Sequence, residues 1–173
     1  MKDNSIRIAN CSGFYGDKLS IARDMIEGGP IDVLTGDYLA ELTMTILYNQ
    51  KLKRGEEHGY VGTFLKQFKD VAKLAQKKDI KIVTNAGGLN QSSMAAAVEE
   101  IVQELNLDLK VAYIEGDDLM PRIDELYKGG ETLTNIDKAL DLQNYKKKPI
   151  TANAYLGAWG IKEALDNGAD VVI

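Results

Sequence analysis

The sequence predicts an α/β fold with a mainly parallel, open sheet of about five strands and helices on both faces, Rossmann-like or flavodoxin-like. Short β-branched runs alternate with segments of helical periodicity along the chain. One run, at residues 80–83, passes through small and polar residues directly into a helix start. The length of 173 residues suits one domain, so residues 1–173 are expected to form a single α/β domain.

The first two strands are expected over residues 6–9 and 31–34. The helix between them covers about residues 20–27, where apolar side chains recur at helical spacing. Two glycines and a proline at residues 28–30 end it. Asp37 follows the second strand and is placed to cap the next helix.

The middle of the chain repeats the same alternation. Residues 51–59 form a polar loop, and an amphipathic helix follows with its apolar face at residues 64–75. The third strand, at residues 80–83, leads into a helix that carries apolar residues up to Leu105. Residues 110–114 are the fourth strand.

The last third of the chain is less regular. Pro121 fits the first turn of a helix that runs to about Lys128. Residues 129–149 interrupt the alternation of strands and helices, and only a short helix that includes Ile136 is expected there. A helix over residues 154–167 and a fifth strand close the chain. No loop follows that strand, so the sheet is expected to be incomplete and the chain to be the N-terminal part of a longer protein.

Composition narrows the choice of partners and compartment. The net charge of −5 disfavours nucleic acids and anionic membranes as partners. A single cysteine, Cys11, allows no disulfide within the chain and fits a reducing compartment. No apolar run approaches the length of a membrane span, and the N-terminus lacks a signal peptide, so the cytoplasm is expected.

A ligand site is expected where the strands end. The carboxyl ends of parallel strands share one edge, and ligands of such sheets bind there. The turn after the third strand has glycines and a helix N-terminus, which suit an anionic ligand. The alternative is that these residues only form turns and caps. The residues expected to bind substrate are Asn10, Gly13, Tyr15, Gly36, Tyr38, Asn85, Gly87, Gly88, Asn90 and Asp118.

These turns contain three carboxylates that are candidates for catalysis or metal binding: Asp37, Asp117 and Asp118. Asp37 and Asp117 are the candidate acid–base residues, and the three together are of the type that holds Mg²⁺. Helix capping is the alternative role for each. No cluster of His or Cys has zinc-ligand spacing, and His58 and Cys11 lack recognisable catalytic partners. The glycine patterns match neither the NAD nor the ATP motif, so no cofactor is identified.

Five sequence blocks resemble the acyclic terpene utilisation family (AtuA-like proteins). They lie at residues 10–17, 27–44, 83–90, 116–118 and 152–161, in the order of the family. The last block adds Asn153 to the expected substrate-binding residues. Family members are longer, and their sequence continues as Thr-Gly-Arg after the block that ends this chain, which supports the expectation of an N-terminal portion.

The resemblance implies a role in the bacterial breakdown of acyclic terpenes such as citronellol and geraniol, which proceeds through CoA thioesters. The expected function is therefore catabolic, with an enzyme favoured, and the expected ligand is a small apolar acid or its acyl-CoA thioester. The alternative is a non-catalytic binding or assembly module that a missing C-terminal segment or a partner subunit completes. The expected partners are a small-molecule substrate and either a second copy of the chain or a complementary subunit.

Overall fold

The sheet has five strands, and all of them are parallel. The computed structural model describes residues 5–146 and 148–173. The strand order across the sheet is β1 (Ile8–Asn10), β2 (Val33–Gly36), β3 (Lys81–Thr84), β5 (Val171–Val172) and β4 (Val111–Ala112). The predicted α/β class with a parallel sheet is confirmed. The order itself shows that the last strand in the sequence lies between β3 and β4.

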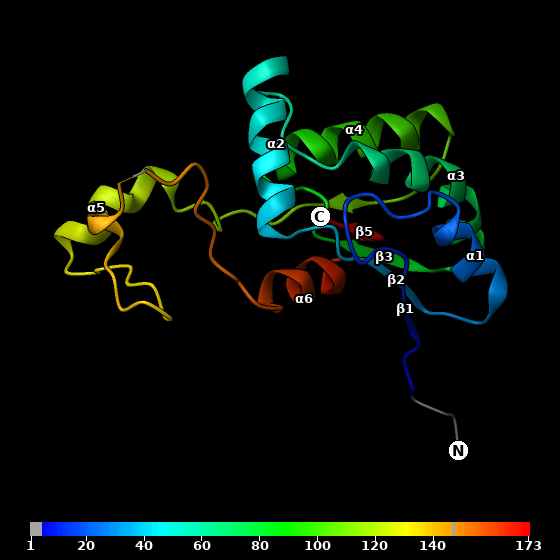
Figure 1. The fold of residues 1–173 in the computed structure, drawn as a ribbon. Coiled ribbons are helices and arrows are strands. Elements are labelled where there is room, and N and C mark those ends of the chain that lie inside the picture. Colours follow the sequence, from blue (N-terminus) through cyan, green and yellow to red (C-terminus); the bar gives the residue numbers. More distant parts are fainter. Residues whose placement is uncertain (1–4, 147) are drawn as a thin grey trace. The chain divides into compact units, whose positions relative to one another are not determined.

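The strand order explains which face each helix covers. The helices α1 (Ile21–Gly28), α3 (Gly62–Lys78) and α4 (Gln91–Glu104) lie on one face, and α6 (Trp159–Asp166) lies on the other (Figure 1). Right-handed crossovers keep helices on one face while the chain advances from β1 to β4. The return from β4 to β5 reverses the direction and places α6 opposite. The expectation of helices on both faces is therefore confirmed.

The core lies between the sheet and the face with three helices. Side chains alternate along β2 and β3, so Leu34 and Ile82 face this layer and are buried. The helices contribute an apolar stripe each, with Phe64 and Phe68 stacked at 6.0 Å between ring centroids. The helical residues buried in this core are Ala22, Ile26, Leu47, Phe64, Phe68, Val71, Ala72, Ala75, Met94, Ala95, Val98 and Val102.

Helix α2 (Glu41–Arg54) begins and ends differently from the prediction. It continues through residues 51–54, the first part of the polar loop expected at residues 51–59, and ends at Gly55, whose φ is 118°. Its N-cap is Ala40, which makes no side-chain hydrogen bond. The prediction that Asp37 caps this helix is therefore wrong, and the Asp37 carboxylate pairs elsewhere.

Two segments in the last third also differ from the prediction. Helix α6 begins at Trp159, not at residue 154, because Asn153 and Ala154 pair with Asp118 and Asp117 in an antiparallel bridge. Gly157 then has a φ of 72°, which a helix does not allow. Within residues 129–146 the structure has no α-helix, and the short 3₁₀ helix η2 (Leu142–Asn144) is the regular element there.

The chain divides into two compact units. The first comprises Met1–Glu115 and Gly157–Ile173 and holds the whole sheet. The second, Gly116–Leu156, holds η1 (Met120–Arg122), α5 (Ile123–Lys128) and η2. The single-domain expectation stays a prediction. Among the described helices, none has the length and apolar character to cross a membrane.

Candidate functional site

The turns that follow β1, β2 and β3 meet at the carboxyl edge of the sheet. The Asp37 backbone N–H donates to the Ser12 carbonyl at 2.9 Å. The Tyr38 backbone N–H donates to Asn85 Oδ1 at 2.8 Å. These two bonds join residues that lie 25 and 47 positions apart in sequence. The predicted meeting of the turns at one edge is therefore observed for these three strands.

Asp37 and Asn85 form the polar centre of this edge. Asn85 Nδ2 donates to Asp37 Oδ1 at 2.6 Å, and both residues are exposed. Asp37 Oδ2 has no hydrogen-bond partner within the residues that the structure describes. On β1 and β2, Asn10 Oδ1 accepts a long hydrogen bond of 3.4 Å from Thr35 Oγ1. The edge thus presents one carboxylate oxygen and amide groups to solvent.

The turn after β1 is filled by a side chain that the sequence reasoning missed. Asp17 Oδ2 accepts from the backbone N–H groups of Gly13 at 2.6 Å and Phe14 at 3.2 Å. The Ser12 hydroxyl lies 3.4 Å from the same oxygen. The chain's own carboxylate therefore occupies the position that an anionic ligand of this turn would take. A carboxylate four residues after a turn glycine is the one sequence signal for it.

The glycines after β3 are required by packing within the protein. Gly88 has a φ of 56°, and an added Cβ would lie 2.3 Å from Leu47 Cδ1. A Cβ on Gly87 would lie 2.9 Å from Ile173 Cγ2. After β2, a Cβ on Gly36 would lie 2.5 Å from the Tyr38 ring. These close contacts account for the three glycines without a ligand, and their role in substrate binding stays a prediction.

Asn90 is the N-cap of α4. Its Oδ1 accepts from the Ser93 backbone N–H at 3.1 Å, and its Nδ2 donates to the Glu56 carbonyl at 2.7 Å. The side chain therefore joins the helix N-terminus to the loop that follows α2. Tyr15 makes a similar link, since its hydroxyl accepts from Gln50 Nε2 of α2 at 2.9 Å.

Tyr38 lies beneath the edge and does not line it. Its hydroxyl donates to Gln67 Oε1 at 2.5 Å, and Cys11 Sγ lies 3.9 Å from the same hydroxyl. Burial raises the pKa of both the Cys11 thiol and the Tyr38 hydroxyl above their ordinary values. Both groups are therefore neutral near pH 7 and serve as buried anchors. Gln67 was not predicted, because a glutamine on a helix gives no sign of its burial.

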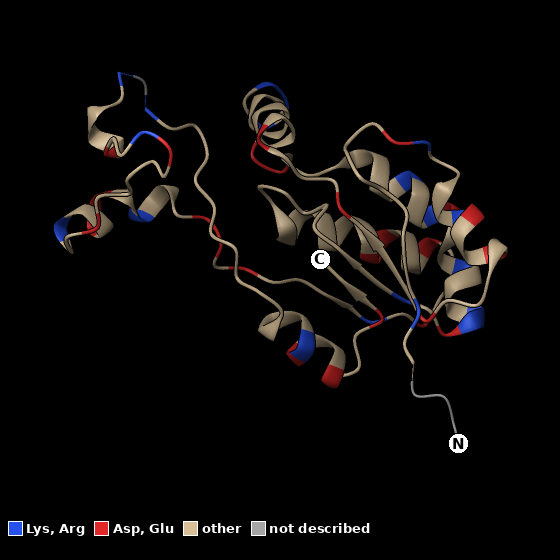
Figure 2. Cartoon of the chain, turned by 60° about the horizontal axis from the view of Figure 1, so that its bottom comes forward, with Lys and Arg blue, Asp and Glu red and all other residues tan. Residues whose placement is uncertain are grey.

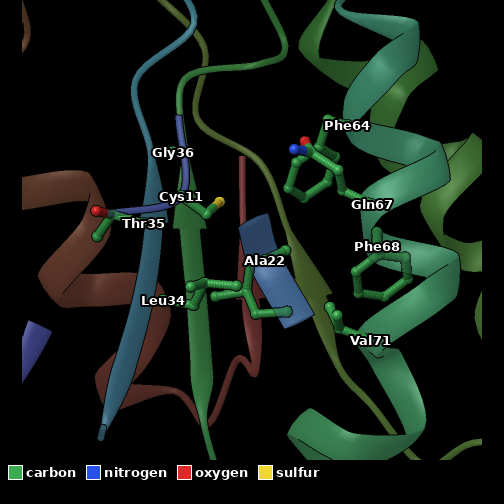
Figure 3. A pocket seen from close by; sticks show the side chains of 10 residues that line it. Cys11, Ala22, Leu34, Thr35, Gly36, Phe64, Gln67, Phe68 and Val71 are labelled. Atoms are coloured by element: carbon green, nitrogen blue, oxygen red, sulfur yellow. The ribbon is translucent and has the colours of Figure 1, made fainter. Parts of the chain in front are cut away.

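A small cavity lies next to these anchors, within the core. It is about 10 Å³, which is room for at most one water molecule. Figure 3 shows Cys11 and Gln67 at one end and Phe68 and Val71 at the other, with the strands opposite α3. Its position and size do not suit a substrate. It is a packing gap between the sheet and the helices.

The remaining predicted residues belong to the second unit. Asn153 Nδ2 donates to Asp117 Oδ2 at 2.9 Å, and Asp118 Oδ1 accepts from the Met120 backbone N–H at 2.9 Å. Asp118 therefore caps a local turn. Over residues 5–146 and 148–173, no three Asp, Glu, His or Cys side chains gather as metal ligands in either unit.

Comparison with known proteins gives one match. A family profile with the description "Acyclic terpene utilisation family protein AtuA" matches residues 6–173. Searches of curated proteins and of solved structures found no match. The family match covers nearly all of the chain, including every element of the sheet and both units.

Proposed function

The chain belongs to the acyclic terpene utilisation family, and from this premise we propose that it binds or transforms a small apolar acid or its acyl-CoA thioester. The binding place in this proposal is the carboxyl edge of β1, β2 and β3. The observation that carries it is the Asp37–Asn85 pair, which long-range contacts hold in a fixed position at that edge. Exposed apolar side chains on the flanking segments, Phe14 and Leu42, supply contacts for a hydrocarbon chain.

Asp37 is the proposed acid–base residue. Its Oδ1 is occupied by Asn85, and its Oδ2 has no partner in the described parts of the chain. A carboxylate held in place on one side and open on the other can accept a proton from a bound substrate. In this proposal Asn85 positions the carboxylate, and the exposed amide of Asn10 donates to the substrate's oxygen.

The two carboxylates at the edge favour a neutral substrate group over a free carboxylate group. Asp17 and Asp37 both lie in the edge turns, and within the described residues neither forms an ion pair. A carboxylate ligand would be repelled by both, whereas a thioester carbonyl carries no net charge. At this position we therefore expect a neutral thioester carbonyl to be preferred to a free carboxylate, while the negatively charged phosphates of CoA must lie away from Asp17 and Asp37.

The proposed compartment is the cytoplasm. The one cysteine is buried and unpaired, which fits a reducing environment. A CoA thioester as ligand also agrees with an intracellular role.

Isothermal titration calorimetry tests this proposal. Acyclic terpenoid acids, the matching alcohols and the CoA thioesters are titrated with and without Mg²⁺. Asn85→Ala is expected to weaken thioester binding at least about tenfold, since it removes the group that holds Asp37. Asp37→Asn is expected to keep binding within about threefold and to abolish any turnover.

The matched control is Asp108→Asn, which changes an exposed carboxylate outside the edge and should leave binding unchanged. Absence of binding by the folded protein to every compound, with and without Mg²⁺, would refute the proposal. Thioester binding that Asn85→Ala leaves unchanged would place the site elsewhere. Either result would favour the alternative, a non-catalytic binding or assembly module.

A further inference from the structure

Helix α3, all of which the structure describes, has one polar side chain among its buried residues. Gln67 is 2% exposed and lies among Phe64, Phe68 and Val71, which face the sheet. The charged residues of α3 are all exposed, and Figure 2 marks them in blue and red. Burying an amide costs free energy that an apolar side chain of similar size would not lose. Core packing alone therefore does not account for a glutamine at this position.

The Gln67 side chain joins two segments beneath the carboxyl edge of the sheet. Its Oε1 accepts from the Tyr38 hydroxyl at 2.5 Å, and its Nε2 donates to the Lys18 carbonyl at 3.4 Å. Tyr38 belongs to the turn after β2, and Lys18 to the segment between β1 and α1. Figure 3 shows Gln67 extending from α3 towards the strands. The buried amide thus holds the segments after β1 and β2 from one point on the helix.

Tyr38 connects this buried amide to the Asp37–Asn85 pair. Its ring lies against Gly36, where an added Cβ would be 2.5 Å from the ring, and meets Phe64 edge-on at 6.0 Å between ring centroids. Its backbone N–H donates to Asn85 Oδ1 at 2.8 Å, and Asn85 Nδ2 donates to Asp37 Oδ1. Asp37 is the exposed residue between two buried ones, Gly36 and Tyr38. Fixing the Tyr38 side chain on the inside therefore fixes the direction in which Asp37 faces solvent.

We propose that Gln67 is a positioning residue of the carboxyl-edge site, which acts through Tyr38 to hold Asn85 and Asp37 in place for the substrate. The inference rests on the function proposed for that edge. The hydrogen bonds of Gln67 go to Tyr38 and Lys18, so its effect on the substrate is indirect. A shift of about 1 Å in a reacting group can lower a rate about 100-fold, so a contact beneath the edge is able to matter for the chemistry above it.

A double variant separates positioning from packing. In Tyr38→Phe/Gln67→Met both partners of the buried hydrogen bond become apolar with little change of size, so neither is left unpaired in the core. The melting temperature is expected to stay within about 5 °C of that of the natural sequence. Nuclear magnetic resonance of the ¹⁵N-labelled protein then follows the Asn85 side-chain amide. Its signals are expected to shift and broaden, because the turn after β2 is no longer held from beneath.

The matched control is Gln76→Met on the same helix. Gln76 is exposed, and its Oε1 accepts from the Asp108 backbone N–H at 2.8 Å, away from the edge turns. This change should leave the Asn85 signals unchanged. Isothermal titration with the CoA thioester of an acyclic terpenoid acid supplies the second measurement. The double variant is expected to raise the dissociation constant at least about threefold, and the control should not alter it.

Unchanged Asn85 signals in the folded double variant would overturn the proposal, because Gln67 would then serve the core alone. Shifted signals with unchanged thioester binding would overturn it as well. Absence of thioester binding to the natural sequence would refute the proposed function, whereas the Asn85 signals need no ligand and still decide whether Gln67 positions the edge. If the double variant does not fold, Tyr38→Phe alone removes the same hydrogen bond, keeps the ring, and is expected to shift the same signals.

Discussion

Gly88 is a turn residue whose small size is required by the packing of the core beneath it. Its φ of 56° is one that residues with a side chain rarely adopt, and Leu47 and the Gly59 carbonyl fill the space where a Cβ would be. In the sequence the same glycine suggests close approach of a ligand. Both explanations require a small residue, and the structure supplies the packing reason for it.

Gly88→Ala is expected to lower the free energy of unfolding by at least about 2 kcal/mol, because it adds backbone strain and a clash with Leu47. Urea denaturation followed by circular dichroism measures the change. Gly62→Ala is the control, since nothing lies within 4 Å of the Cβ position there and Gly62 is in α3. It should leave stability unchanged or raise it by up to about 1 kcal/mol. Equal effects of the two changes would contradict this account.

Strands β1 and β2 are joined at their start by an exposed ion pair. The Arg7 guanidinium donates to both Asp32 carboxylate oxygens, at 3.0 Å and 2.9 Å, and the Arg7 backbone N–H donates to the same carboxylate at 2.7 Å. These hydrogen bonds lower the pKa of Asp32 from 3.8 to about 2. A lowered folded-state pKa means that the unfolded chain takes up the proton first as the pH falls.

The contribution of Asp32 to stability is therefore complete above pH 3.8 and is lost as the pH falls through about 2. Asp32→Asn is expected to make the loss of stability between these pH values less steep. Urea denaturation at intervals from pH 5 to about 2 measures it. Asp108→Asn, at an exposed carboxylate with no ion pair among the described residues, serves as the control. Parallel pH profiles for Asp32→Asn and the natural sequence would show that the pair has no such effect.

The whole sheet depends on a strand that comes last in the described chain. Strand β5 pairs with β3 on one side and β4 on the other, so it joins the two parts of the sheet. Val172 is 1% exposed, and its register partners are Val83 and Ala112. Strands β3 and β4 are therefore joined only after the chain has returned from the second unit.

Val172→Ala is expected to lower the free energy of unfolding by about 2 kcal/mol, because it leaves a gap where two strands meet. Thermal and urea denaturation measure the loss. Leu52→Ala, which removes a larger but exposed side chain, should change stability by less than about 0.5 kcal/mol. A similar small change for Val172→Ala would mean that β5 contributes little to the sheet.

Short β-branched runs alternate with segments of helical periodicity along the chain. This pattern was sufficient to predict the α/β fold class, the parallel sheet and the turns at the carboxyl edge of the sheet. These features follow from local preferences, since a strand or an amphipathic helix shows its period over a few residues. The same local patterns misplaced the ends of α2 and α6, where a glycine conformation and the bridge between Asp118 and Asn153 set the boundaries.

The sequence by itself determined which segments become strands and helices and which turns follow the carboxyl ends of the strands. The tertiary structure decided that β5 lies inside the sheet, that Asp17 fills its own turn, and that Asp37 pairs with Asn85 rather than capping α2. The physical reason is that period and propensity act over neighbouring residues, whereas strand order and side-chain pairing depend on which distant segments meet in the folded chain.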